Sequence, residues 1–175
     1  MSPASEQTPQ RIVVGVAPDQ PAAVVETAVR VAERYGAELV CAWVDPARYA
    51  IDEWPDGTII SMSLDADAAD EAVETADPEI AEAIARTVGD SAVPWSVRAL
   101  AGAPADALAR LAEELDAAMI VVGTRQPGLI GTVRELVNGS VADQLSHRQH
   151  RPVLVIPLGH DDDDSLAWDE AGIVP

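Results

Sequence analysis

Short apolar runs alternate along this chain with segments in which apolar residues recur at helical spacing. Five runs have the length of a buried strand, and continuous apolar character is typical of a parallel strand covered on both faces. The predicted strands are residues 12–16, 39–44, 95–100, 119–122 and 153–156. Because helical segments separate them, the pattern predicts an α/β fold with a parallel sheet and right-handed crossovers.

Residues with known capping preferences mark where the predicted helices begin and end. The expected first positions are Pro21, Pro78, Pro104 and the residue that follows Ser140. Asp77 is the expected N-cap of the second helix, because its side-chain oxygen can accept a hydrogen bond from the first turn. Gly36 is the expected end of the first helix. Thr132 and Ser140 each precede an acidic residue by three positions, which predicts a short helix ahead of the last one.

One stretch has neither the apolar runs of a buried strand nor apolar residues at helical spacing. Residues 46–65 are predicted to form a long connection, with Pro55-Asp56-Gly57 as a turn inside it. An acidic helical region is expected to follow from Asp65 and to be interrupted near Asp77. Connections of this length in compact domains are often functional, so the segment adds a candidate region to the predicted fold.

Charge and composition restrict the classes of partner and enzyme. The chain has 175 residues, enough for one domain with a full core. Its net charge is −19, and all eleven basic residues are arginine. A field of that sign opposes association with nucleic acid or an anionic membrane, so we expect neither as a partner. Without lysine the chain cannot carry a Walker-A lysine, a Schiff-base lysine or a kinase-type lysine.

The cysteine content and the two ends of the sequence bear on its location and organisation. Cys41 is the only cysteine, so no internal disulfide can form, and we expect a buried, inert thiol in a reducing compartment. The first residues lack the basic start and apolar stretch of a signal peptide, and no apolar run reaches membrane-spanning length. We therefore expect a cytoplasmic protein with a disordered N-terminus (1–10), an α/β domain (11–158) and an acidic C-terminal tail (159–175).

The segment between the last two predicted strands has the composition of an anion-binding loop. Its glycines, at positions 123, 128, 131 and 139, let a ligand approach the backbone because no Cβ blocks the way. The helix after Ser140 offers unpaired N–H groups and the positive end of its dipole, which suit a phosphate. Two other interpretations stay open: the glycines can serve only turns with positive φ, and Ser140 with Asp143 can serve only as helix caps.

The sequence shows no combination of residues that is typical of a catalytic or metal-binding site. The basic cluster from His147 to Arg151 falls at the expected end of the last helix, where cations complement the dipole. A metal would need ligands beyond its two histidines. The sequence contains no Gly-x-Ser-x-Gly elbow and no candidate Cys-His nucleophile arrangement. We expect no catalytic residue, no metal site and no enzyme activity, with slow incidental ATP hydrolysis left open.

Several blocks of the chain, in order, resemble the universal stress protein family. They are Ile12-Val-Val-Gly-Val, the segment from Gly102-Ala-Pro-Ala-Asp-Ala-Leu to Gly123-Thr-Arg, Gly139-Ser-Val, and Arg151-Pro-Val-Leu-Val-Ile. The resemblance covers most of residues 11–157. It implies a Rossmann-like, adenine-nucleotide α-hydrolase-like fold with five parallel strands in the order 3-2-1-4-5 and helices on both faces. It also implies a stress-response role and a homodimer with its contact along residues 153–156.

Many members of the family bind ATP between the first and fourth strands, and others lack nucleotide. The resemblance therefore implies ATP, accompanied by Mg²⁺, as the ligand, with an unknown protein as the partner. By position, adenine would lie near Val44 and the ribose near Gly15, Val16 and Ala17. The phosphates would meet Gly123, Thr124, Arg125, Gly128, Gly131, Arg134, Gly139, Ser140 and Val141. Arg125 and Arg134 are the only cations of that loop, and either can neutralise phosphate charge.

The loop also differs from the family's pattern. Nucleotide-binding members resemble one another in an Asp at the end of the first strand, where this chain has Ala17. Their usual spacing is Gly, two residues, Gly, nine residues, then Gly-Ser or Gly-Thr. Here Gln126 stands at the second glycine position, and the run from there to Gly139 is about three residues too long. The longer loop can wrap phosphates or fill the crevice itself, so a nucleotide-free dimeric binding or scaffold protein remains the alternative.

Overall fold

A five-stranded parallel sheet forms the centre of the computed structural model, which describes residues 10–18, 20, 22–65, 67, 70–124 and 140–158. Its strands are β1 (Arg11–Val16), β2 (Glu38–Asp45), β6 (Trp95–Ala101), β7 (Met119–Gly123) and β8 (Val153–Ile156). They lie in the order β6-β2-β1-β7-β8, and every neighbouring pair is parallel. Counted along the chain, these five strands have the order 3-2-1-4-5, which confirms the predicted topology.

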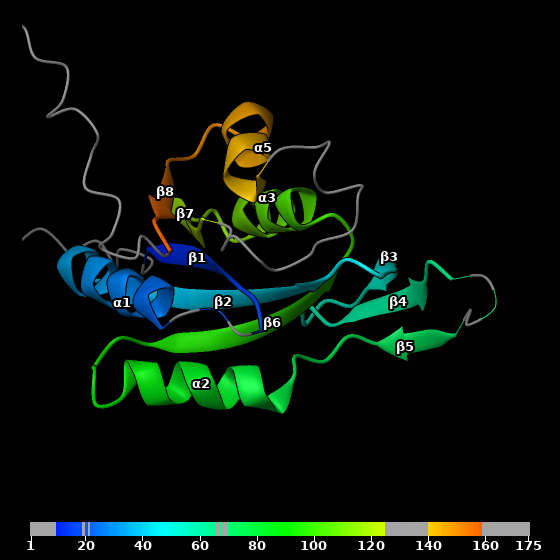
Figure 1. Cartoon of the computed structure of the whole chain (residues 1–175), viewed down its shortest axis with the longest axis horizontal. Coiled ribbons are helices and arrows are strands. Elements are labelled where there is room, and N and C mark those ends of the chain that lie inside the picture. Colours follow the sequence, from blue (N-terminus) through cyan, green and yellow to red (C-terminus); the bar gives the residue numbers. More distant parts are fainter. Residues whose placement is uncertain are drawn as a thin grey trace, which may run out of the picture.

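In the part of the chain that the structure describes, helices cover both faces of this sheet (Figure 1). The helices α1 (Ala23–Tyr35) and α2 (Pro78–Val88) lie on one face, and α3 (Pro104–Glu114) and α5 (Val141–Arg148) on the other. The caps predicted at Asp77 and Gly36 are confirmed, whereas α1 begins at Ala23, two residues after the predicted Pro21. The Asp77 carboxylate accepts from the backbone N–H of Glu79 at 2.9 Å, and Gly36 ends α1 with φ of 60°. Positive φ is accessible to glycine because it has no Cβ.

Alternate residues of the central strands enter two separate cores. Ile12, Val14 and Leu39 pack under α1 and α2, whereas Val13 and Val40 pack under α3 and α5. This two-sided burial explains why the strands are continuously apolar in the sequence. Cys41 belongs to the first core and is fully buried. Burial raises the pKa of the Cys41 thiol to about 12, which fits the expected inert thiol because the reactive thiolate is not formed near neutral pH.

The segment between β2 and α2 differs from the sequence prediction. Instead of a long connection followed by an acidic helix, it forms a second, antiparallel sheet of β3 (Arg48–Glu53), β4 (Ile59–Ser63) and β5 (Glu71–Val73). The turn at Gly57, with φ of 80°, joins the first two of these strands. Val73 is the only apolar side chain larger than alanine in residues 65–77, so a helix there would bury little apolar area, and the backbone of Glu71–Val73 pairs with β4 instead.

Three further sequence predictions concern the ends of the chain and the 123–140 loop. The predicted disordered N-terminus and the acidic tail lie outside the described residues, apart from Gln10. The short helix predicted ahead of Ser140 lies outside them as well. Within the part of the chain that the structure describes, no helix has the length and apolar character needed to cross a bilayer.

Candidate functional site

The carboxyl ends of β1 and β7 lie side by side where the sheet reverses its winding direction. Val14 pairs with Val121, so Val16 and Gly123 stand at the same level two residues further along. On the other side of β1, Val16 pairs with Trp43, which places Ala17 beside Val44. Open α/β sheets bind ligands at such a point. The structure thus brings six predicted site residues to one edge of the sheet: Gly15, Val16, Ala17, Val44, Gly123 and Thr124.

Gly15 is needed for packing of the sheet against α3. A Cβ at this position would lie 3.0 Å from Leu108 Cδ1 and 3.2 Å from Val122 Cγ1. Contacts this short would force the leucine side chain away from β1. The glycine therefore allows α3 to approach the end of β1, and its role in the described structure does not depend on a ligand.

Gly123 is surrounded by side chains of the protein itself. A Cβ there would lie 2.5 Å from Leu158 Cδ1 and 3.0 Å from both Gln20 Nε2 and Val24 Cγ2. Gly123 is not among the described glycines with positive φ, so the interpretation as a turn glycine is wrong for this position. Its small size instead makes room for the segment that follows β8.

Thr124 holds that same segment by two hydrogen bonds. Its backbone N–H donates to the carbonyl of Ile156 at 2.8 Å, and its hydroxyl accepts from the backbone N–H of Leu158 at 2.7 Å. The hydroxyl of Thr124, one of the predicted phosphate-binding residues, thus already accepts a hydrogen bond within the protein. Gly123 and Thr124 together anchor the chain after β8 beside the candidate site.

The first turn of α5 supplies the predicted anion-binding amides. The Ser140 hydroxyl accepts from the backbone N–H of Asp143 at 3.1 Å, which confirms its role as a helix cap. The N–H groups of Val141 and Ala142 have no partner within a helix that begins at this point. Leu145 is fully buried and fixes α5 in the core on the α3 face. These amides remain suited to an anion.

The other predicted site residues lie outside the described residues: Arg125, Gly128, Gly131, Arg134 and Gly139. The basic cluster at the end of α5 has mainly structural contacts. Arg148 forms an ion pair with Asp106 of α3, and Arg151 donates from Nε to the carbonyl of Ala117 at 2.9 Å. Within the described ranges, no group of acidic, histidine or cysteine residues could hold a metal ion.

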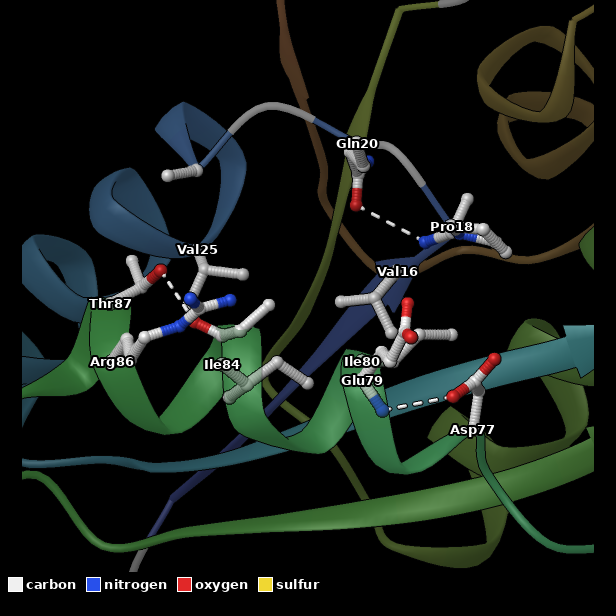
Figure 2. Close-up of a pocket in the computed structure, with 13 residues that line it drawn as sticks. Val16, Pro18, Gln20, Val25, Asp77, Glu79, Ile80, Ile84, Arg86 and Thr87 are labelled. Carbon is white, nitrogen blue, oxygen red and sulfur yellow. Dashed lines mark hydrogen bonds between the residues drawn. The ribbon is translucent and has the colours of Figure 1, made fainter.

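A cavity of about 290 Å³ opens beside Ala17, between the end of β1, the start of α1 and the length of α2. Figure 2 shows Val16, Val25, Ile80 and Ile84 as apolar lining residues. Sequence reasoning missed this cavity, which lies between two helices. The position of α2 against α1 was not predictable from either helix alone.

The charges of this cavity do not favour a phosphate. Among the described residues of its lining are two carboxylates, Asp77 and Glu79, and one guanidinium, that of Arg86. The cavity also lies on the α1 and α2 face, whereas α5 lies on the opposite face. The α5 amides are therefore the better-suited group for an anion among the described residues.

The titrating groups with shifted pKa values do not belong to this edge of the sheet. Hydrogen bonds from Thr58 lower the pKa of Asp56 in the turn before β4. Burial raises the pKa of Glu114 at the end of α3, and repulsion from Glu53 adds to that effect.

Comparison with known proteins shows to which family this fold and site belong. The model of the universal stress protein family matches residues 8–157. No curated protein matches the chain. Among solved structures, the chain is similar to a universal stress protein in complex with cAMP, at 27% identity and a TM-score of 0.56, over 86% of this chain and 98% of the other.

Two further solved structures share the fold at lower identity. One is the Archaeoglobus fulgidus universal stress protein in complex with dAMP, with 20% identity, a TM-score of 0.53, and coverage of 84% of this chain and 97% of the other. The second is an Arabidopsis thaliana family protein with AMP bound, with 15% identity, a TM-score of 0.50, and coverage of 90% and 97%. At these identities the likeness shows the fold alone.

Proposed function

The chain belongs to the universal stress protein family, and from that membership we propose that it binds an adenine nucleotide, ATP with Mg²⁺, as a cytoplasmic stress-response module. The observation that carries the proposal is the meeting of β1 and β7 at the winding reversal, where such sheets bind ligands. The relative in complex with cAMP supports an adenine nucleotide as the ligand class. The nucleotide is proposed as a bound signal and not as a substrate, although slow incidental hydrolysis is compatible with this role.

In this proposal, the phosphates of the nucleotide lie at the start of α5. The amides of Val141 and Ala142 point out of a helix N-terminus, and a phosphate there would meet the positive end of the dipole. Arg125 and Arg134 of the preceding loop would offset the repulsion that a chain of net charge −19 exerts on a triphosphate. The adenine would lie near Val44, beside the end of β1.

Calorimetric titration of the full chain with ATP and Mg²⁺ tests this proposal. Wild-type protein is expected to release or absorb heat on binding, and Ser140→Ala is expected to bind about tenfold more weakly, because a hydrogen bond to a charged phosphate is lost. Ser140→Thr retains the hydroxyl and serves as the matched control. Titrations with AMP and cAMP identify which phosphate arrangement the site prefers. No heat at millimolar concentration of any of the three would contradict nucleotide binding.

A second candidate function is a nucleotide-free scaffold protein of the same fold. The observation that favours it is the closure of the crevice beside Gly123 by Leu158, together with the bond from the Leu158 N–H to Thr124. The same titration distinguishes the two functions when a Leu158→Ala chain is included. If wild-type protein binds no nucleotide and Leu158→Ala does, the crevice is closed by the protein itself. Equal binding by both chains would show that Leu158 does not obstruct the ligand.

The homodimer is proposed to form along β8, the edge strand of the main sheet. Val155 of this strand has 39% of its surface exposed, an apolar side chain that a partner strand would cover. Like-charged chains repel, so the dimer is expected to strengthen as salt screens the charge. Sedimentation should show a dimer at 0.5 M salt and a monomer for Val155→Asp. A wild-type monomer under those conditions, or a dimeric Val155→Asp chain, would remove β8 as the interface.

A further inference from the structure

Exposed large apolar side chains are concentrated in and beside the small antiparallel sheet. Five of the seven large apolar side chains that are exposed among the described residues lie between positions 49 and 73. They are Tyr49, Ile51, Trp54, Leu64 and Val73. This sheet extends from one end of the molecule, beyond the five parallel strands (Figure 1). Clustered apolar exposure of this kind marks an interaction surface more often than scattered single residues do.

Strand register assigns two of these side chains, Tyr49 and Val73, to one face of the small sheet. Tyr49 pairs with Met62, and Ile60 pairs with Val73, so alternation along β4 places both rows on the same side. Ile51 lies at the bulge between these rows and is 43% exposed. We call the set Tyr49, Ile51, Ile60, Met62 and Val73 the outer face. Its exposed members are Tyr49, Ile51 and Val73, whereas Ile60 between them is buried, with 7% of its surface exposed.

The opposite face of the small sheet packs against the body of the protein. Ile59 is only 1% exposed and belongs to the core that Leu100 and α3 share. Arg48 is turned to this inner side, where its Nε donates to the Ser61 hydroxyl at 2.7 Å and forms an ion pair with Glu74 at 3.1 Å. The inner face therefore has its partners within the chain, and the outer face is the one open to another molecule.

Charge around the outer face selects the kind of partner. Residues 48–73 contain seven carboxylates and one basic residue, Arg48, whose guanidinium is engaged on the inner side. Two of these acidic residues stand opposite outer-face residues of β4 in the strand register: Asp52 opposite Ile60, and Glu71 opposite Met62. A second copy of this chain would bring the same acidic groups together, which costs free energy. Nucleic acid and anionic lipid surfaces are disfavoured for the same reason.

We propose that the outer face is a docking surface for a cationic segment of a partner protein, in which arginine or lysine side chains alternate with apolar ones. The apolar side chains of that segment would cover Tyr49, Ile51 and Val73. Its cations would pair with Asp52 and Glu71 at the rim of the contact. This surface is separate from the winding reversal of the main sheet, so it does not depend on nucleotide binding.

Binding of a defined peptide tests the docking surface. The probe is a fluorescently labelled synthetic peptide of alternating arginine and valine, titrated into the nucleotide-free full chain and followed by anisotropy. The double variant Ile51→Thr with Val73→Thr is expected to bind about tenfold more weakly, because apolar contact area is lost. Threonine keeps strand preference, and circular dichroism checks that the fold is retained. Tyr35→Ser removes an equally exposed apolar side chain from α1 and should bind the peptide as wild type does.

Charge variants and a second peptide complete the test. Asp52→Asn with Glu71→Gln is expected to weaken binding several-fold and to reduce its salt dependence. A peptide with glutamate in place of arginine should not bind. Equal affinity of wild-type protein and the threonine double variant would overturn the proposal, because attraction would then come from net charge alone. The proposal is also overturned if the threonine double variant changes the sedimentation of the protein without peptide, since the face would then be an interface between copies.

Discussion

Replacing Leu145 with alanine is expected to lower the free energy of unfolding by about 2–5 kcal/mol, the usual cost of such a cavity in a core. Leu145 is fully buried and is the only buried residue of α5 among the described positions. The short helix therefore depends on this one side chain for its attachment to α3 and the sheet. Urea denaturation followed by circular dichroism measures the change, and a loss below 1 kcal/mol would contradict the anchoring role.

The same substitution is expected to weaken nucleotide binding in protein that is still folded. The amides proposed to hold the phosphates belong to the first turn of α5, so a loosened helix presents them less accurately. Leu111→Ala is the matched control, because Leu111 lies in the same core but on α3. Both variants should lose similar stability, and only Leu145→Ala should lose affinity in calorimetry. Equal loss of affinity in the two would assign the effect to general destabilisation.

The central strands β1, β2 and β7 were predictable because they are apolar on both faces. That pattern follows from burial under two helix layers and needs no knowledge of partners in space. The helix ends were predictable for a similar reason, since Asp77, Gly36 and Ser140 act on their own local backbone. The strand order came from resemblance to a family and not from the pattern, because many orders bury the same strands.

The small sheet was missed because its signals are short and non-local. β5 has only three residues, Glu71–Val73, and its composition carries no strand pattern of its own. What fixes it is pairing with β4, for example Ser61 with Ala72. The acidic residues before it suggested a helix, but the apolar positions of such a helix are alanines apart from Val73, and they would bury little area against the protein.

The glycines of the site were identified from the sequence, but their roles were not. Gly15 meets Leu108, and Gly123 meets Leu158, in each case a residue many positions away in the chain. A sequence pattern can mark where the backbone must lack a side chain, but it does not tell whether a ligand or the protein fills the space. Only the arrangement of α3 and of the segment after β8 decides this.

Arg48→Met is expected to destabilise the small sheet by about 3–5 kcal/mol, because it leaves a buried carboxylate without its cation. Arg48 and Glu74 have only 16% and 4% of their side chains exposed, and the Ser61 hydroxyl joins them by donating to the Glu74 carboxylate. Hydrogen exchange of the amides in β4 measures the loss locally, and urea denaturation shows whether the whole domain shares it.

A second substitution separates the charge effect from lost packing. Glu74→Gln in the Arg48→Met background removes the unpaired charge and should recover part of the stability, since a neutral amide costs less to bury than a carboxylate. Because the outer face depends on the same three strands, Arg48→Met should also weaken binding of the cationic peptide while nucleotide affinity stays unchanged. Unaltered exchange in β4 would mean that the ion pair is not what holds the sheet together, and the apolar contacts of Ile59 would then have to suffice.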